Sequence, residues 1–570
     1  MADLIIKNGY VYDPLNGVDG EKYEIHISKG KIVDEVDRRD AKIIDASNMV
    51  VMPGGVDLHS HIAGSKINIG RAMRPEDHRK DVMPRTSLTR AGVGYSCPST
   101  FFTGYRYAQM GYTTVFEPAM PPLSARHVHE ELNDIPIIDK GAFTLMGNNY
   151  FVLKYVKSKD LNMLKGFMAW LLKATRGYAV KIVNPGGVEN WKWGKNVGGL
   201  DDLVYNFEVT PREIITSLAK VNEELGLPHT IHLHCNNLGV PGNWETTIES
   251  IKSVESIKPS EGRTRVVHVV HCQFNALDGE NWVKLKSGAC KIAKYVNEHN
   301  HVTIDLGQVI FTDTTTMTGD GPWQFRLHNL TGNKWVNSDV EMEAGAGVVP
   351  YTFRKENPAN AIQWAIGLEL ALMVHDPWKI SMTTDHPNGG PFLYYPKVIS
   401  WLMSRKARTD TMLELNRSCI KKTGLAGIYR EYDFNEIAII TRAAPSMLLG
   451  LKNKGHLGVG ADGDVSIFNV NPTDWKPSMY RDVENAFSRA AFTIKKGEIV
   501  TKNGEIAANP LGKTFWVDAK VSEKIESDVL EDLRSEFKRI YTVSLNNYPV
   551  QDAYLPLSES VEIQTGRCLS

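Results

Sequence analysis

The residues with the clearest chemical potential in this chain are His59 and His61, which stand two apart at the end of an apolar run, Met49 to Leu58. Side chains two residues apart on a β-strand point to the same side, so one segment can offer a metal ion two neutral nitrogen ligands. A single His-x-His pair means little by itself. It gains weight because four later strand-like runs end in further candidate ligands, which are Lys181, His234, His271 or His268, and Asp385.

Lys181 lies in the run Tyr178 to Asn184, which has the pattern of a buried strand. A charged lysine is costly there unless it is paired or neutralised. A desolvated, neutral amine can add carbon dioxide to give a carbamate, which is an anionic oxygen ligand able to bridge two cations. The alternative is that the Lys181 side chain extends along the strand to its solvated end.

Two later strands each carry two histidines. His232 and His234 face the same side of their strand, and only His234 lies at the C-terminal end. We therefore expect His234 to be a ligand and His232 to pack one layer deeper. His268 and His271 face opposite sides of the next strand, and His271 is preferred because it is nearer the end.

Asp385 follows Ser381-Met-Thr-Thr and precedes His386-Pro-Asn-Gly-Gly, which marks an abrupt exit from a strand into a loop. A carboxylate there can contact a metal ion and also take a proton from its bound water. The alternative is a structural aspartate in a turn or at a helix start. A mononuclear or binuclear centre assembled from single residues at several strand ends is typical of the catalytic end of a barrel, and it predicts metal-assisted hydrolysis with Asp385 as the catalytic residue.

Size and charge narrow the class of protein. The chain has 570 residues, which predicts a large domain with a smaller second one. Its 65 basic and 66 acidic residues give a net charge of -1, which offers no electrostatic reason to bind nucleic acid or a membrane surface. Six cysteines without a Cys-x-x-Cys pair argue against a disulfide framework or a ferredoxin-type cluster.

The chain also lacks sequence signals for export or membrane insertion. The N-terminal stretch Met1 to Gly9 has no basic leader followed by an apolar segment. The longest apolar helical stretch, residues 361–374, is too short to span a bilayer and contains Gln363 and Glu369. We therefore expect a cytoplasmic protein.

The elements that must position these residues fall into three parts. Short strands separated by turns occupy residues 3–52 and return near residues 464–500, which predicts a composite β-sandwich domain from residues 1–52 and 450–515. Residues 53–449 alternate strand-length apolar runs with longer amphipathic segments, as in a parallel α/β fold. Residues 516–570 are expected to form a C-terminal extension.

The middle part contains eight strand candidates, the number needed for a closed (β/α)8 TIM-like barrel. They are Val50–His59, Thr113–Glu117, Pro136–Phe143, Ala179–Val183, Thr230–Cys235, Arg265–His271, Val302–Val309 and Lys379–Asp385. One intervening helix is well marked. Thr210 as N-cap and Glu213 form a capping box, and Pro211 occupies the first helical position before an apolar stripe.

Two connections are unusually long, and connections of this length in a compact domain are often functional. Residues 62–111 follow the first strand and are rich in arginine and lysine, and residues 311–357 follow the seventh and contain Trp323, Phe325 and Trp335. We expect both to shape the substrate pocket. The alternative for the basic stretch is a solvated loop that contacts a partner.

The order His-x-His, Lys, His, His, Asp along eight strands resembles the amidohydrolase superfamily. The run Pro53 to His59, the late helix Thr441 to Leu451 and the return Gly458 to Phe468 support this resemblance. It implies a metal-dependent amidohydrolase barrel beside a composite β-domain.

Three longer stretches are more specific: GVGYSCPSTFFTGYRYAQMGYTTVFEPAMPP at 92–122, ENPANAIQWAIGLELALM at 356–373 and SMTTDHPNGGPF at 381–392. They resemble the A-subunit family of formylmethanofuran dehydrogenase, and the likeness covers nearly the whole chain. The resemblance implies methanogenic one-carbon metabolism within a complex whose tungsten or molybdenum pterin and iron–sulfur subunits reduce carbon dioxide to formate. The present chain would then join formate to the amine of methanofuran.

The combined expectation is a site with two Zn2+ ions bridged by N6-carboxylated Lys181 and no redox cofactor in this chain. The predicted metal ligands are His59, His61, Lys181, His234, His271 and Asp385. The basic loop Lys66 to Arg90, with Arg71 and Arg74, is expected to hold the carboxylate-bearing tail of methanofuran. The rival interpretations are a stand-alone hydantoinase or N-acyl amino acid deacylase, which would share every ligand, and a non-catalytic scaffold.

Overall fold

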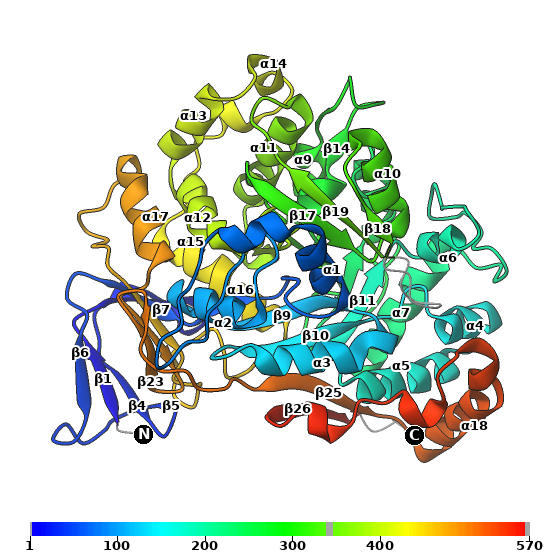
Figure 1. Ribbon diagram of the computed structural model, residues 1–570, viewed down its shortest axis with the longest axis horizontal. Helices are drawn as coiled ribbons and strands as arrows, with labels where there is room; N and C mark the ends of the chain where they lie inside the picture. The colour runs from blue at the N-terminus through cyan, green and yellow to red at the C-terminus, as the bar shows by residue number, and fades with distance from the viewer. Residues whose placement is uncertain (1–2, 338–345, 565–570) are drawn as a thin grey trace.

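A computed structural model describes residues 3–337 and 346–564, and its centre is a curved sheet of parallel strands with helices outside (Figure 1). Within this part of the chain, eight strands follow one another in sequence order around the sheet. They are β8 (Gly55–Asp57), β9 (Tyr112–Met120), β10 (Asp139–Leu145), β11 (Ala179–Val183), β12 (Ile231–His234), β13 (Val267–Val269), β16 (Val302–Asp305) and β20 (Ile380–Ser381).

The ring of strands closes where the first and last strands end. Ser60 and His386 form a parallel bridge, and the His61 N–H donates to the His386 carbonyl oxygen at 2.7 Å. Every predicted barrel strand overlaps an observed one. The expectation of an amidohydrolase-type barrel is therefore confirmed.

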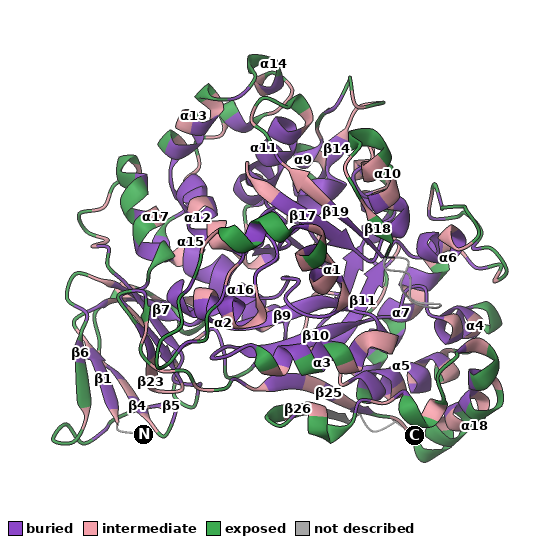
Figure 2. Ribbon diagram, viewed as in Figure 1, coloured by how far each residue is buried: buried purple, intermediate pink, exposed green. Residues whose placement is uncertain are grey.

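The strands are buried on both faces because helices cover the outside of the sheet (Figure 2). Helix α7 (Pro211–Leu225) shows the predicted capping box, with the Glu213 N–H donating to Thr210 Oγ1 at 3.2 Å and the Thr210 N–H donating to Glu213 Oε2 at 2.9 Å. Its apolar stripe is buried, as is nearly all of α11 (Pro358–Met373). In the described part of the chain, no helix is both long and apolar enough to cross a bilayer.

The N-terminal strands and the late strands share one smaller sheet. Its order is β24-β23-β22-β21-β7-β2-β3, with bounds Glu505–Ile506, Glu498–Lys502, Phe492–Lys495, Val465–Phe468, Val50–Pro53, Tyr10–Asp13 and Val18–Glu21. A four-stranded sheet packs beside it and consists of β5 (Lys31–Val33), β4 (Ile25–Ser28), β1 (Leu4–Lys7) and β6 (Lys42–Asp45). The exact domain boundaries stay predictions.

The expected strand Val50–His59 is instead two strands, β7 and β8, which belong to different sheets. The chain crosses between the sheets at Gly54, whose N–H donates to the Asp464 carbonyl oxygen at 2.8 Å. A Cβ at position 54 would lie 2.3 Å from Thr113 Oγ1, so only glycine fits this close approach. The apolar run was continuous in sequence because both strands are buried.

A buried ionic cluster joins the smaller sheet to the barrel. Lys495 Nζ lies 2.6 Å from Asp139 Oδ2 and 2.8 Å from Asp464 Oδ2, and Lys454 Nζ lies 2.7 Å from Asp464 Oδ2. Asp139 begins the barrel strand β10. In the smaller sheet, Lys495 is the last residue of β22, and Asp464 directly precedes β21. Burial alone would raise the pKa of Asp139, but Lys454 and Lys495 hold it well below its usual range.

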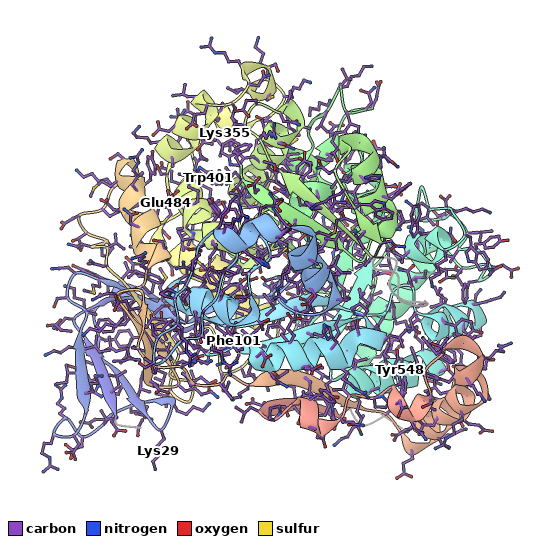
Figure 3. All side chains as sticks on the ribbon, in the orientation of Figure 1. Lys29, Phe101, Lys355, Trp401, Glu484 and Tyr548 are labelled. Carbon is purple, nitrogen blue, oxygen red and sulfur yellow. The ribbon has the colours of Figure 1, made fainter. Side chains whose placement is uncertain are left out.

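The C-terminal region packs onto the barrel. Strand β25 (Thr514–Lys520) pairs in parallel with β10, and β26 (Ser558–Gln564) pairs with β25. Between them, α18 (Glu523–Ile540) contacts α5 (Leu161–Thr175), and the Tyr548 ring stacks on Trp170 at 5.8 Å between centroids (Figure 3). The expected extension therefore adds strands to the barrel sheet.

Both long connections contain secondary structure. The first includes α1 (Ser65–Met73) and α2 (Thr100–Gln109). The second forms a small antiparallel sheet, β17 (Asp313–Thr318), β19 (Gly347–Thr352) and β18 (Val336–Asn337), with helix α10 (Gly321–Thr331). Residues 338–345 of this connection, the first two residues and Cys568 lie outside the described residues.

Candidate metal centre

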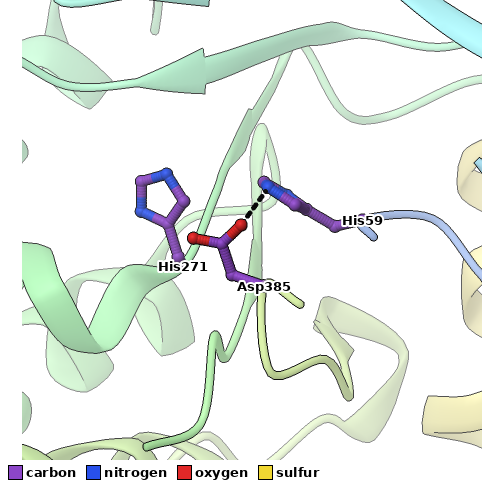
Figure 4. Close-up of side chains that lie close together, drawn as sticks. All are labelled: His59, His271 and Asp385. Carbon is purple, nitrogen blue, oxygen red and sulfur yellow. Dashed lines mark ion pairs between the residues drawn. The ribbon is translucent and has the colours of Figure 1, made fainter. Parts of the chain in front are cut away.

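Three predicted site residues from three strand ends meet at the C-terminal end of the barrel. His59, His271 and Asp385 offer donor atoms that all lie within 4.8 Å of one another, and all three side chains are buried. His59 Nε2 is 2.9 Å from Asp385 Oδ1. Figure 4 shows the carboxylate of Asp385 between the two imidazoles.

His61 approaches the same carboxylate oxygen. Its Nε2 lies 3.4 Å from Asp385 Oδ1, and its ring is 5.8 Å from that of His59 between centroids. The His-x-His pair therefore directs two imidazole nitrogens at one point, as expected for side chains two apart on an extended segment.

Two carboxylates that were not predicted from the sequence contact the Nδ1 atoms of these rings, on the side away from Asp385. His59 Nδ1 lies 2.9 Å from Asp305 Oδ2, and His61 Nδ1 lies 2.9 Å from Glu117 Oε1. A carboxylate accepts a hydrogen bond from the Nδ1–H, so the proton stays on Nδ1 and the Nε2 lone pair is free for a metal ion. Burial would lower the pKa of His59, but the carboxylates of Asp305 and Asp385 raise it to about 9. The electrostatic environment at the His59 ring therefore favours a positive charge.

His234 and His271 stand together on the other side of the site, with ring centroids 4.7 Å apart. His234 Nε2 lies 3.1 Å from Asp320 Oδ2, so Nδ1 is the nitrogen left to bind a metal. Burial lowers the pKa of both imidazoles, which keeps them in the neutral form that metals require.

Lys181 projects from β11 toward the same group of residues and is buried. Its amine has no hydrogen-bond or ion-pair partner among the residues that the structure describes. Burial lowers the pKa of Lys181 to about 7, and its electrostatic neighbours include Asp385 and Asp305. An amine with this pKa is about half neutral at neutral pH, and the neutral form can form a carbamate.

The other two histidines lie deeper, in a hydrogen-bonded layer beneath the site. His232 Nε2 is 3.1 Å from His59 Nδ1, and His268 Nδ1 is 2.8 Å from Thr303 Oγ1. His59, His232 and Asp305 also group donor atoms closely, but those atoms already contact one another at hydrogen-bond distances. This geometry supports the preference for His234 and His271, which stays a prediction.

Asp385 is held in one orientation. Asn388 Nδ2 donates to Asp385 Oδ1 at 3.0 Å, and the Asn388 N–H donates to the Asp385 carbonyl oxygen. Burial would raise the pKa of Asp385, but His59 and His271 hold it well below its usual range. Asp385 has φ 49° and His271 has φ 36°, a left-handed conformation that is uncommon for such residues and is frequent at functional sites.

A narrow cavity of about 60 Å³ leads to Asp385 and has room for a few water molecules. Apart from Asp385 its lining contains no charged side chain among the described residues. The walls are aromatic and aliphatic side chains with several amides, chiefly Phe274, Trp282, Trp323, Tyr351, Phe353, Asn360 and Gln363. The expectation that the second long connection shapes the pocket agrees with this lining.

Two arginines of the basic connection form ion pairs with acidic side chains of the described chain. Arg74 contacts Asp77 and Asp313, with its Nε 3.1 Å from Asp77 Oδ1. Arg71 pairs with Glu131, and its Nε donates to the Pro98 carbonyl oxygen at 2.9 Å. These contacts join the basic connection to α3 (Ala125–Asp134) and to strand β17 of the second long connection. The expectation that Arg71 and Arg74 hold an anionic substrate tail stays a prediction.

The donor set could hold a metal ion such as zinc. It combines imidazole nitrogens and a carboxylate, which are ligands that zinc accepts. Three of the histidines each have a carboxylate on the ring nitrogen away from the site: Asp305, Glu117 and Asp320. One sequence signal could have found two of these partners, because Asp305 and Glu117 are charged residues at or near the ends of buried strands. Asp320 had no such signal because it lies in a connection.

The chain matches a family model for the amidohydrolase family over residues 42–501. It is 51% identical to "Protein FwdA" of Methanocaldococcus jannaschii over 557 residues, which is 97% of each chain. It is 35% identical to the A subunit of the formyltransferase/hydrolase complex Fhc of Methylorubrum extorquens over 559 residues, again 97% of each chain.

A solved structure agrees with these relatives. The crystal structure of the formyltransferase/hydrolase complex FhcABCD from Methylorubrum extorquens with methylofuran contains a chain that is 34% identical, with a TM-score of 0.89. The match covers 98% of this chain and 100% of that one. The family resemblance and the enzymatic class indicated by the sequence motifs are confirmed.

Proposed function

We propose that this chain, which belongs to the amidohydrolase family, is the subunit that joins formate to the amine of methanofuran in a formylmethanofuran dehydrogenase complex. The balanced reaction consumes formate and a protonated primary amine and releases the formamide and one water molecule. The observation that carries the proposal is the convergence of His59, His271 and Asp385 at the barrel mouth in a chain 51% identical to FwdA.

The proposed cofactor is a pair of zinc ions held by His59, His61, His234, His271, Asp385 and a carbamate on Lys181. When bound, zinc would supply Lewis-acid polarisation of a carbonyl oxygen and a water molecule of lowered pKa. The Lys181 amine would form the carbamate by bonding to the carbon of carbon dioxide and losing one proton. Its burial and its lowered pKa support this step.

Asp385 is proposed to move the protons of the reaction. In the synthetic direction it takes one proton from the ammonium group, which frees the amine for attack, and a second from the nitrogen after the C–N bond forms. It passes both to the departing formate oxygen, which leaves as water, and hydrolysis runs the same steps in reverse. Asn388 keeps the carboxylate oriented for this task, with a contact of 3.0 Å. The side chain of Asp385 also lines the cavity, so it reaches both the metal ligands and the substrate.

The cavity supports a substrate with a flat, uncharged part next to the reacting amine. Trp323, Phe274 and Tyr351 provide apolar faces, and Asn360 and Gln363 provide hydrogen-bonding groups. A bound substrate that fills this small cavity would displace water from it, which would favour amide formation over hydrolysis.

The proposal also places the chain in a larger assembly. The Fhc relative belongs by name to a multi-subunit complex, and the matching solved structure contains that complex. We infer that this chain has pterin-containing and iron–sulfur partner subunits and receives formate from them. No step in its own site requires an electron carrier.

The test is substrate discrimination by the purified, zinc-loaded chain. Release of formate from N-formylmethanofuran is measured beside ring opening of a hydantoin and deacylation of an N-acetyl amino acid. The proposal predicts activity on the formamide at least a hundredfold above the other two. Preference for either of those substrates would assign the site to a stand-alone hydrolase.

A further inference from the structure

Asp320 lies where the wall of the cavity meets the metal centre. It is the N-cap of α10, the helix whose residues Trp323, Gln324 and Leu327 line the cavity. Its side chain is buried, with 2% of its surface exposed. It comes from the long connection after the seventh barrel strand, yet it reaches a candidate ligand on the fifth, His234.

The two carboxylate oxygens of Asp320 have separate partners. Oδ1 accepts the Trp323 N–H at 3.1 Å and the Asn184 side-chain amide at 3.0 Å. Oδ2 contacts His234 Nε2 at 3.1 Å. One oxygen therefore caps the helix, and the other is committed to the imidazole.

This division determines the tautomer of His234. A carboxylate can only accept a hydrogen bond, so the proton of the neutral imidazole must sit on Nε2. The lone pair is then on Nδ1. The same contact fixes the rotation of the ring, which metal affinity requires as much as the tautomer.

We propose that Asp320 is a positioning residue, which holds His234 in the tautomer and orientation that bind zinc and ties that ligand to the cavity wall α10. The inference rests on the proposed zinc centre and deepens it. It gives Asp320, which is not a metal ligand, a role in metal binding. It also links the position of α10, which lines the cavity, to the position of the ligand His234.

Asp320→Asn separates this role from helix capping. Asparagine is as good an N-cap as aspartate, and its oxygen can still accept from Trp323 and Asn184. These two donors orient the amide so that its NH2 group faces His234. The imidazole must then accept on Nε2 and carry its proton on Nδ1, the nitrogen needed by zinc.

The experiment titrates Zn2+ alone into the metal-free, full-length chain in competition with a chromophoric chelator, and it also measures the thermal unfolding of the metal-free protein. We expect Asp320→Asn to weaken zinc binding at one site by about 10- to 100-fold, the usual effect of removing an outer partner of a ligand. The unfolding temperature without metal should stay near that of the wild type.

Asp160→Asn is the matched control. Asp160 caps α5 by accepting the Met163 N–H at 3.0 Å, and it is exposed and contacts no histidine among the described residues. It should leave zinc binding unchanged. Asp320→Ser is the second variant, since serine caps a helix but offers His234 no carboxylate.

The outcomes divide cleanly. Weaker zinc binding in both Asp320 variants, with unfolding temperatures like that of the wild type, supports the positioning role. Wild-type affinity in Asp320→Asn overturns it. If Asp320→Asn also loses stability, Asp320→Ser decides: a stable variant with weak zinc binding supports the role, and zinc affinity that simply follows stability overturns it. A wild-type chain that binds no zinc overturns the proposed function together with this inference.

Discussion

At the scale of single residues, the carboxylates of the site occupy two kinds of position relative to the histidine rings. Asp385 faces the candidate ligands and the cavity, whereas Asp305 and Glu117 lie behind His59 and His61. The first kind can move a proton, and the second kind fixes which imidazole nitrogen is free. We therefore expect a change at Asp385 to affect chiefly the rate, and a change at Asp305 or Glu117 to affect chiefly metal binding.

Asp385→Asn tests the first kind. The amide can still coordinate through its oxygen but cannot accept a proton, so we expect the fold and at least one zinc ion to be retained while formyl transfer falls about 10²- to 10⁴-fold. The measurement compares the rate of formate release with the zinc content of the same preparation. Turnover near that of the wild type would assign Asp385 a structural role only.

The candidate ligands could be predicted from sequence because each occupies the end of a recognisable strand. Lys181 is conspicuous because charge is rare in a buried strand, and His59 and His61 share a spacing that sets their direction. Asp320 could not be found in this way. Its contact with His234 depends on how a connection of more than forty residues folds back over the barrel, and no local pattern encodes that path.

At the scale of elements, the two long connections have different tasks. In the arginine-rich one, Arg71 pairs with Glu131 of α3, outside the connection. The other supplies α10 and β19, which wall the cavity. Charge composition alone does not reveal that acidic side chains elsewhere in the fold, Glu131 and Asp313, pair with Arg71 and Arg74.

Trp323→Ala tests the role of α10 as a substrate wall. Trp323 lines the cavity and packs against Gly239, where a Cβ would lie 2.3 Å from the indole ring. Removing the ring should raise KM for N-formylmethanofuran about 10- to 100-fold, the equivalent of about 1.5–3 kcal/mol of apolar contact. Because the indole has no group that could take or give a proton at the reacting amide, kcat should change little.

Steady-state kinetics on the formamide and on a small formylated amine separate the effects. The small substrate lacks the part that we expect to contact the indole, so its KM should be unchanged. An equal loss of kcat for both substrates would show that Trp323 supports the metal centre and does not contact substrate.

The barrel strands were predictable because each is a short apolar run between turn signals, from Ala179–Val183 to Val302–Asp305. The division at Gly54 was not, since residues on both sides are equally apolar and only the pairing of β7 with β21 reveals a change of sheet. The pairing of β25 with β10 also joins segments far apart in sequence. Such pairings depend on tertiary packing.

At the scale of the whole molecule, the buried ionic cluster couples the smaller sheet to the barrel. Asp139, Lys454, Asp464 and Lys495 neutralise one another, and all four side chains are buried. A buried charge left without its partner is strongly destabilising. The cluster therefore makes the relative placement of the two parts specific.

Asp139→Asn should lower the free energy of unfolding by about 3–5 kcal/mol at neutral pH, because it leaves two buried lysines with less negative charge. The pKa of Asp139 is lowered in the folded state, so its contribution is fully present above the unfolded-state pKa of about 4 and is lost as the pH falls below it. Denaturant unfolding at pH 7 and at pH 3 measures both effects. The difference between wild type and variant should shrink at the lower pH.

Asp201→Asn is the control for this change. Asp201 forms a two-point ion pair with Arg212, at 2.7 and 2.8 Å, on the surface. Surface pairs contribute little to stability, so this variant should unfold like the wild type at both pH values. If Asp139→Asn loses no more stability than Asp201→Asn, the buried ionic cluster does not stabilise the fold.

The central claim is a binuclear zinc centre at the barrel mouth, and anomalous diffraction at the zinc edge from crystals of the zinc-loaded protein tests it most directly. The account predicts two zinc peaks per chain among His59, His61, His234, His271 and Asp385, with density beyond Lys181 Nζ for a bridging carbamate. A single peak, no peak, or an unmodified Lys181 pointing away from the metal would contradict it.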